Sequence, residues 1–472
     1  MTLLVISPDY ASHLLPLATL ATSWRDAGER VVVATGPATR TIVDSFGYDW
    51  TDLRLSRGSN AGVIRAEEQA GGEDDALRGF FAATEHGMLP TLLYQANARL
   101  ADLLWNPVET ARRVIDVVEA VQPDQVIVDH LAFSARLALQ AGGAPHADVV
   151  LGHPTALPAG DEVYGYPPMW PKAFDPDPGE LAALHQRCVV VRDAFTAEWN
   201  AALRTLAPQS EPSGDAFAEH GNLLLLNYPR ALHDPARTAL LPPHAFLGSA
   251  VRDEALPADI AEWLSAPSDM PVVYVSFGSF LSVRADVQAR VVAALRRMEV
   301  RVALAIGSAD PAVVGELPSH WLVREYLPQV RLLRRAALAV THGGNNSVTE
   351  ALTCGVPMLV LPFSTDQFAG AAVVENAGLG LVLDPNAASV AGLELAARAL
   401  LGGDSASAAA DLGASLRAIP GREKARAAFT GAHPATAERA PVPVSGGQQP
   451  FPRRRCPPRR TRCRRWCRHT RR

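Results

Sequence analysis

The chain has 472 residues, enough for two or three domains of ordinary size, and a globular composition with 48% hydrophobic and 20% charged residues. Its net charge of -5 hides an uneven distribution, because the last twenty residues contain eleven Arg and no acidic residue. Without them, 33 basic residues (44 minus 11) stand against 49 acidic ones, a balance of -16. An acidic body argues against a general nucleic-acid-binding surface.

The start of the chain is not typical of a secretory signal, because the apolar run 3–6 ends at Ser7-Pro8-Asp9 without a basic leader or a cleavage site. No apolar run approaches the roughly 18 to 20 residues needed to span a bilayer. The two cysteines of the body, Cys188 and Cys354, lie far apart and indicate a reducing compartment without a disulfide framework. We therefore expect a soluble cytoplasmic protein with no stable membrane insertion.

The first half of the chain alternates short apolar runs with amphipathic segments. The runs cover residues 3–7, 30–35, 125–129, 147–152 and 222–227. Nearly continuous Val, Ile and Leu predicts strands buried on both faces, and hence a parallel sheet covered by helices. Between the first two runs the pattern predicts a helix with Leu17, Leu20 and Trp24 on one face, ended by Gly28.

The second half repeats this design. Its apolar runs cover residues 271–276, 301–307, 321–327, 338–342, 358–363 and 380–384. Two such series predict an α/β protein with two doubly wound, Rossmann-like domains, whose carboxyl strand edges face each other across a cleft. Residues 229–269 are rich in Pro and lack a long strand run, so we expect them to link a first domain over 1–228 to a second over 270–430.

Residues 431–472 change to a Pro/Gly/Gln-rich and then an Arg/Pro/Cys-rich composition, and we expect them to be disordered. An RNA-binding arm is one interpretation of this tail. A zinc site at Cys456, Cys463, Cys467 and His469 is another, although their spacing fits no standard finger. We favour a third hypothesis, a shifted reading frame of a GC-rich gene, which resequencing the 3′ end would test.

The segment THGGNNSVTEA, residues 341–351, follows an apolar run and places six polar or flexible residues before a helix. A helix that begins there points its free N–H groups and positive dipole end at the strand edge, where a phosphate can bind. The hydroxyl of Ser347 and the amide of Asn346 add hydrogen bonds, and Glu350 offers an acceptor to a ribose diol. The alternative is that Asn346 or Ser347 only caps the helix and Glu350 completes a capping box.

The next apolar run ends in a second polar cluster, Ser364-Thr365-Asp366-Gln367, at another expected helix start. Asp366 and Gln367 suit sugar hydroxyls there, although Asp366 alone is equally typical of an N-cap.

The joint spacing of these motifs resembles the donor-binding signature of the family 1 nucleotide-sugar glycosyltransferases of the GT-B fold. The matching positions are His342, Gly344, Asn346, Ser347, Glu350, Gly355-Val356-Pro357, Pro362, Asp366 and Gln367. The resemblance implies that His342, Asn346 and Ser347 hold the diphosphate, that Glu350 binds the ribose, and that Asp366 and Gln367 bind the sugar.

The resemblance extends upstream. Tyr326-Leu327-Pro328-Gln329 is similar to the family's Trp-x-Pro-Gln segment, with Tyr326 as a departure and Gln329 near the base. Ser276-Phe277-Gly278-Ser279 matches the first loop of the family's donor domain, where Ser279 would contact the phosphates. The family usually ends with a helix that crosses back to the first domain, and the sequence pattern does not predict one here.

The resemblance also implies a catalytic base at the first strand edge. His13 lies near an expected helix start after the run 3–7, and Asp129 ends the run 125–129, so both belong at the same edge of the sheet. Asp129 would accept the Nδ1 hydrogen of His13 and stabilise the imidazolium. Structural roles, as a histidine near a helix start and an aspartate in a turn, are the alternatives. Neither a dinucleotide-binding glycine motif nor a P-loop is present in the sequence, which disfavours NAD and ATP chemistry.

The segment YGYPPMW, residues 164–170, lies in the longest irregular stretch of the first half. It suits a flat hydrophobic acceptor or, alternatively, a Pro-braced packing loop. The candidate acceptor residues are His153, Tyr164, Tyr166, Met169 and Trp170.

These observations predict an inverting glycosyltransferase with an acceptor domain over 1–228 and a donor domain over 270–430. The resemblance implies a dTDP- or UDP-sugar as co-substrate and a hydrophobic natural-product acceptor, without a cofactor. No acidic pair typical of a metal site is evident in the sequence, so we expect no divalent-ion requirement. Three alternatives remain: a nucleotide-sugar epimerase, a glycolipid transferase, and a non-catalytic protein that keeps the fold. Retention of both His13 and Asp129 argues against the last.

Overall fold

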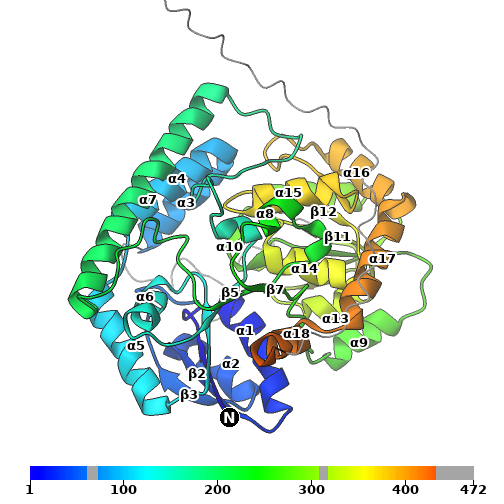
Figure 1. The fold of residues 1–472 in the computed structure, drawn as a ribbon. Coiled ribbons are helices and arrows are strands. Elements are labelled where there is room, and N and C mark those ends of the chain that lie inside the picture. The colour runs from blue at the N-terminus through cyan, green and yellow to red at the C-terminus, as the bar shows by residue number, and fades with distance from the viewer. Residues whose placement is uncertain (61–72, 308–316, 432–472) are drawn as a thin grey trace, which may run out of the picture. The chain divides into compact units, whose positions relative to one another are not determined.

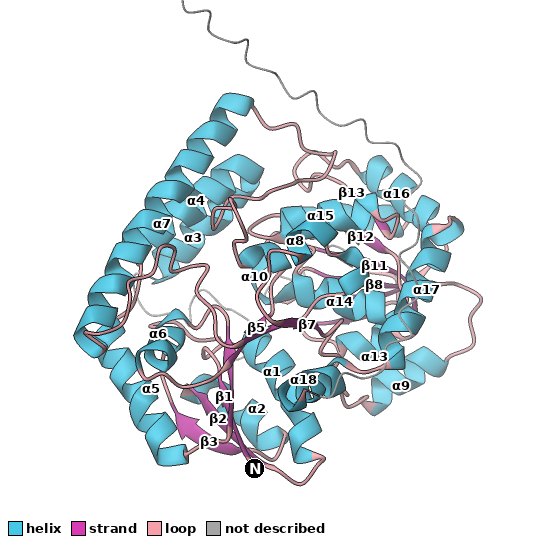
Figure 2. Cartoon of the chain, viewed as in Figure 1, coloured by secondary structure: helices cyan, strands magenta, loops and turns pink. Residues whose placement is uncertain are grey.

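The apolar runs form two parallel sheets in the computed structural model, which describes residues 1–60, 73–307 and 317–431 (Figures 1 and 2). The first sheet has the order β3-β2-β1-β4-β5-β6-β7 and the second the order β10-β9-β8-β11-β12-β13. All strand pairs are parallel. The expected α/β class with two doubly wound, Rossmann-like halves is therefore confirmed.

The strands of the first sheet are β1 (Thr2–Ile6), β2 (Arg30–Thr35), β3 (Asp49–Asp52), β4 (Gln125–Asp129), β5 (Ala147–Val150), β6 (Leu223–Leu226) and β7 (His244–Phe246). The strands of the second are β8 (Val272–Ser276), β9 (Arg301–Ala305), β10 (Leu322–Arg324), β11 (Ala336–Thr341), β12 (Met358–Val360) and β13 (Gly380–Val382).

Helices connect and cover the strands. Those before β8 are α1 (Ala11–Arg25), α2 (Arg40–Ser45), α3 (Glu73–Glu85), α4 (Met88–Ala101), α5 (Pro107–Val121), α6 (Phe133–Ala141), α7 (Pro178–Leu206), α8 (Pro235–Thr238) and α9 (Ala258–Ser265). Those after β8 are α10 (Gly278–Leu281), α11 (Ala285–Leu295), α13 (Gln329–Leu333), α14 (Asn345–Cys354), α15 (Gln367–Asn376), α16 (Val390–Gly402), α17 (Ser405–Ala418) and α18 (Gly421–Thr430).

Both sheets are buried on both faces, as their nearly uniform Val/Ile/Leu composition predicts. Along β1, Leu3 and Val5 belong to one apolar cluster while Leu4 and Ile6 belong to another. The same alternation in β8 divides Val273 and Val275 from Tyr274. Burial on two faces requires helices on both sides of each sheet, which explains the repeated strand–helix order.

The C-terminal helix α18 packs against α1 and β7 of the first half (Figure 1). Phe429 meets the Trp24 ring edge to face at a centroid distance of 5.7 Å. Arg426 donates to Glu29 at 2.7 Å. The expectation that the crossing helix is missing is therefore wrong. The segment was hard to recognise because only Ala425, Ala428 and Phe429 of this polar helix contact the first core.

The stretch 229–269, expected to be a linker, contributes secondary structure of its own. Strand β7 extends the first sheet by pairing with β6, and Phe246 lies opposite Leu226. Helices α8 and α9 also lie in this stretch. A strand of three residues leaves too short an apolar run to stand out in the sequence.

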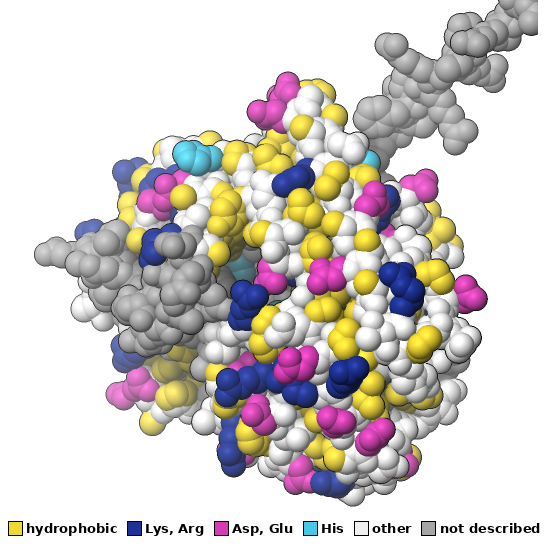
Figure 3. Space-filling model, turned by 90° about the vertical axis from the view of Figure 1, so that its left-hand side faces the viewer, with side chains coloured by type: hydrophobic (Ala, Val, Ile, Leu, Met, Phe, Trp, Pro, Cys, Tyr) yellow, Lys and Arg dark blue, Asp and Glu magenta, His cyan; other side chains and the backbone are white. Residues whose placement is uncertain are grey.

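The described residues all belong to one compact unit. Among the helices within them, none is long and apolar enough to cross a membrane. Basic and acidic side chains are interspersed among hydrophobic ones over the face drawn in Figure 3. The tail residues proposed above as zinc ligands lie outside the described residues.

Candidate active site

The proposed base lies where two adjacent strands of the first sheet end. β1 pairs in parallel with β4, so the start of α1, which carries His13, meets the last residue of β4, Asp129. His13 Nδ1 lies 2.7 Å from Asp129 Oδ2. The second carboxylate oxygen accepts the backbone N–H of Leu131 at 2.8 Å, which holds the carboxylate in place. Asp129 is 1% exposed, whereas the His13 side chain is 27% exposed.

This contact determines which nitrogen of His13 is available for chemistry. A carboxylate only accepts hydrogen bonds, so Nδ1 carries the hydrogen in neutral His13 and Nε2 is the free acceptor. Burial lowers the pKa of His13, but the charge of Asp129 and its hydrogen bond outweigh burial, and the net pKa is raised above 6.5. His13 is therefore a stronger base than free imidazole.

The second half supplies a helix N-terminus at its own strand edge. Helix α14 begins at Asn345, and three residues separate it from the end of β11. Gly343 adopts φ +84°, and a Cβ there would lie 2.7 Å from Val360 Cγ1, so this turn needs glycine. A helix that starts at the carboxyl end of a parallel strand presents its first N–H groups at that strand edge, where an anion can bind.

The His342 ring lies between two glycines. A Cβ on Gly278 would lie 2.9 Å from His342 Cε1, and a Cβ on Gly344 would lie 2.5 Å from Nε2. Burial lowers the pKa of His342 to about 4, so the ring is neutral at neutral pH. Its buried Nδ1 has no hydrogen-bond partner among the described residues. A buried polar atom without a partner is uncommon and suits a ligand that supplies one.

Ser347 lies in the first turn of α14 and is half-buried. Ser279 lies in α10, directly after Gly278, and its side chain is outside the part of the chain that the structure describes.

Asn346 joins the expected phosphate site to the turn that carries the base. Its Nδ2 donates to the Ser12 carbonyl at 3.1 Å, and its Oδ1 accepts from Asn227 Nδ2 at 3.0 Å. Asn227 in turn accepts the N–H of Ala250 with Oδ1 at 2.7 Å and the amide of Asn345 with its carbonyl at 3.0 Å. The Ala250 bond fixes the orientation of the Asn227 amide, so every member of this network has one role.

Replacing Asn227 by Asp should destabilise the protein by about 1–3 kcal/mol, because a 1%-exposed carboxylate cannot donate to Asn346. Urea unfolding measures this free energy. The matched control is Ser249→Ala, which removes one buried hydrogen bond of 3.2 Å to Thr349 of the same helix. If Asn227→Asp lowers the free energy of unfolding no more than the control does, the network does not hold the start of α14 against the first half.

The expected ribose and base residues form a second buried network. The carboxylate of Glu350, 3% exposed, accepts from Gln329 Nε2 at 2.5 Å and lies 3.8 Å from Arg252 Nη1. Burial raises the pKa of Glu350, although Arg252 and Gln329 act in the opposite direction. Arg252 also pairs with Glu254 at 2.6 Å.

Arg252 and Glu254 were missed by the sequence analysis. Their only signal was a cluster of charges, Arg252-Asp253-Glu254, within the apparent linker. Tyr326 is 58% exposed and donates its hydroxyl hydrogen to Glu254 at 3.3 Å. The tyrosine ring therefore stands at the open side of the network, where a base could stack on it.

The expected sugar residues are engaged in the structure. Asp366 accepts the backbone N–H of His153 at 2.5 Å and the hydroxyl of Thr365 at 2.9 Å. Gln367 accepts from the backbone N–H groups of Phe363 and Ser364 at 3.0 and 3.2 Å. Asp366 thus lies against the first half, while Gln367 shapes the turn that carries it.

His153 lies beside both halves of the candidate site. Its Cδ2 is 3.6 Å from the position of a Cβ on Gly370 in α15. Burial and the nearby Arg237 charge lower the pKa of His153 to about 3. Its buried Nε2 has no hydrogen-bond partner among the described residues, while Nδ1 bonds Thr155 at 2.9 Å.

The loop 164–170 packs against the helices of the first half. Tyr164 stacks on Phe217 at a centroid distance of 3.9 Å, and Tyr166 meets His185 edge to face at 5.0 Å. Trp170 packs against the apolar cluster that contains Phe217, whereas Met169 is 37% exposed. Packing therefore accounts for most of this loop, and an acceptor role for these residues stays a prediction.

Across residues 1–60, 73–307 and 317–431, no group of three or more His, Cys, Asp or Glu side chains is arranged to hold a metal ion.

Comparison with solved structures defines the class of fold. The crystal structure of CalG4, the calicheamicin glycosyltransferase, matches with a TM-score of 0.64 at 20% identity and covers 91% of this chain and 96% of its own. The spinosyn rhamnosyltransferase SpnG complexed with thymidine diphosphate matches with a TM-score of 0.61 at 20% identity, covering 91% and 99%. The chain thus has the GT-B fold of these glycosyltransferases.

Sequence comparison finds relatives over part of the chain. Residues 216–410 match the family model described as UDP-glucoronosyl and UDP-glucosyl transferase. The NDP-glycosyltransferase YjiC of Bacillus subtilis is 30% identical over 133 residues, 28% of this chain and 34% of the relative. The oleandomycin glycosyltransferase of Streptomyces antibioticus is 28% identical over 281 residues, 59% and 61%. The chain is thus similar to family 1 glycosyltransferases over this matched segment, and it spans about one third to three fifths of the lengths of these two relatives.

Proposed function

We propose that this protein transfers a sugar from a UDP- or dTDP-sugar to a hydrophobic small-molecule acceptor, with inversion at the anomeric carbon. One observation carries the proposal. Helix α14, whose N-terminus is the expected phosphate site, donates a hydrogen bond from Asn346 to the Ser12 carbonyl at 3.1 Å, and the next residue, His13, pairs with Asp129. A base and an anion site held this close suit a reaction in which an anion leaves as a proton is removed.

In the proposed reaction, Nε2 of His13 takes the proton of the acceptor as its nucleophilic atom bonds to the anomeric carbon. The bond from that carbon to the nucleoside diphosphate breaks on the opposite face, and the diphosphate leaves with the electron pair. Asp129 stabilises the imidazolium that forms. The N-terminus of α14 and the neutral His342 stabilise the charge on the leaving phosphates.

The choice of substrates rests on the relatives. The family model describes UDP-sugar transferases, and SpnG was solved with thymidine diphosphate, which supports either base in the donor. The names of the oleandomycin, calicheamicin and spinosyn enzymes support a natural-product aglycone as the acceptor. The test is incubation with UDP- and dTDP-sugars, with and without such aglycones, followed by mass spectrometry. Donor converted to another sugar nucleotide without acceptor would indicate an epimerase and contradict the proposal.

We further propose that transfer needs no divalent ion, because a helix terminus and hydrogen bonds neutralise the leaving charge. Activity in excess EDTA should then stay within about twofold of the untreated rate, since no metal ion stabilises the transition state. Loss of activity in EDTA that Mg²⁺ restores would contradict this.

A further inference from the structure

Helix α3 belongs to the first half by its place in the chain, yet it also packs against the second. It lies along α4, which lies along α7 (Figure 1). Phe80 of α3, however, packs against the apolar cluster of the second sheet, which includes Val275 and Phe363. The helix therefore connects the two halves.

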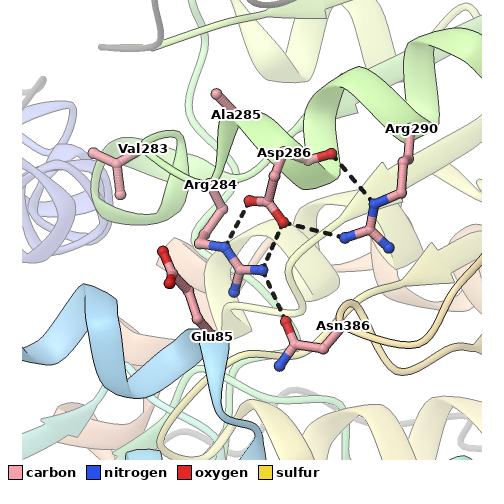
Figure 4. Close-up of a pocket in the computed structure, with 7 residues that line it drawn as sticks. All are labelled: Glu85, Val283, Arg284, Ala285, Asp286, Arg290 and Asn386. Carbon is pink, nitrogen blue, oxygen red and sulfur yellow. Dashed lines mark hydrogen bonds and ion pairs between the residues drawn. The ribbon is translucent and has the colours of Figure 1, made fainter.

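One side chain of the second half holds the end of α3. Arg284, 3% exposed, donates with Nη1 to the carbonyl of Thr84 at 3.1 Å and to its hydroxyl at 3.3 Å. Its Nε and Nη2 donate to the carboxylate of Asp286 at 2.8 and 2.9 Å, and Nη2 also donates to Asn386 Oδ1 at 2.8 Å (Figure 4). Asn386 Nδ2 adds a second bond to the Thr84 carbonyl, at 2.9 Å.

These contacts explain how a cation can be buried here. The Asp286 carboxylate neutralises Arg284 in a bidentate pair, and the Phe363 ring lies 5.2 Å from its guanidinium carbon. Arg284 and Asp286 line a pocket of about 490 Å³ together with Glu85 and Arg290 (Figure 4). A satisfied guanidinium of this kind is a rigid connector.

The connector leads to the expected diphosphate site. Arg284 follows α10 by three residues, and α10 begins at Gly278, which lies against the His342 ring. A shift of α3 can therefore reach α10 and His342 through Arg284.

We propose that Arg284 is a positioning residue that clamps the end of α3 to the segment carrying α10, and so couples the first half to the diphosphate site. The inference rests on the proposed function for its kinetic consequence. Its structural consequence, the attachment of α3, can be measured without any substrate.

The chain offers a matched control in Arg290. Its Nη2 pairs with the same carboxylate, Asp286, at 3.2 Å. Its other bonds go to the carbonyls of Asp286 at 3.3 Å, Ala388 at 2.7 Å and Pro385 at 2.8 Å, all in the second half. Arg290→Ala thus removes a cation from the same cluster and leaves Thr84 in place.

The test is amide hydrogen exchange of residues 76–85 in the full chain. Arg284→Ala should speed exchange there by about tenfold or more, whereas Arg290→Ala should match the wild type. Arg284→Lys keeps the charge and one donor and should restore part of the protection, even if Arg284→Ala folds poorly. Equal exchange in Arg284→Ala and the wild type, or in both alanine variants, would overturn the clamp.

Kinetics separate positioning from general damage. For Arg284→Ala we expect kcat of transfer to fall about tenfold while the Kd for the nucleoside diphosphate changes less than about twofold, because Glu350 and Gln329, the expected ribose and base residues, keep their own network. A parallel loss of nucleotide affinity would overturn the coupling. A wild type that transfers no sugar would defeat the proposed function, while the exchange experiment would still decide the clamp.

Discussion

Replacing His13 by Ala should reduce kcat of transfer by about 10² to 10⁴, the contribution typical of a general base. The nucleotide affinity should be unchanged, because His13 lies at the start of α1 in the first half and pairs with Asp129 rather than with a donor residue. The measurement is steady-state transfer together with calorimetry of nucleotide binding. Loss of both activity and nucleotide affinity would mean that His13 supports the fold rather than the chemistry.

The pH dependence of kcat/KM distinguishes a catalytic role of His13 from a structural one. Because Asp129 raises the pKa of His13 above 6.5, kcat/KM should fall on acidification along a limb centred above pH 6.5. Asp129→Asn removes the charge and should move that limb to lower pH with a reduced plateau. His320, an exposed histidine, is the matched control, and His320→Ala should keep both rate and profile.

Replacing Glu350 by Ala should weaken binding of the nucleoside diphosphate by roughly 10- to 100-fold, since a hydrogen bond to a charged group contributes about 1.5–3 kcal/mol. The buried carboxylate that accepts from Gln329 at 2.5 Å is the group expected to receive the ribose hydroxyls. Calorimetry with UDP and dTDP measures the change.

The control for this prediction is Glu375→Ala. Glu375 lies in α15 of the same half and accepts the backbone N–H of Lys172 at 3.1 Å, away from the Glu350 network. It should bind nucleotide as the wild type does. Equal affinities in all three proteins would exclude Glu350 from the donor site.

Much of the fold follows from local patterns. The runs of Val, Ile and Leu predict buried parallel strands because only such strands are apolar on both faces, and Gly28, at φ +77°, follows α1 as expected. The helix expected within THGGNNSVTEA begins at Asn345, directly after the turn in which Gly343 adopts a conformation that other residues rarely take. Strand β7 could not be predicted because it is only three residues long, and helix α18 could not be predicted because it is polar.

The contacts that complete the site could not be predicted from the sequence for a different reason. Thr84 and Arg284, Ser12 and Asn346 are pairs separated by 200 and 334 residues. No periodicity or motif in one segment records its partner in another. The engagement of Asp366 by the His153 backbone is of the same kind, and it appears only when both sheets are in place.

The most direct test of the account is calorimetric titration of the wild-type protein with UDP, dTDP and their monophosphates. We expect saturable binding of UDP or dTDP, with the monophosphate of the same base bound about tenfold or more weakly, because the N-terminus of α14 and His342 act on the diphosphate. Binding of neither diphosphate, or equal binding of mono- and diphosphate, would contradict it.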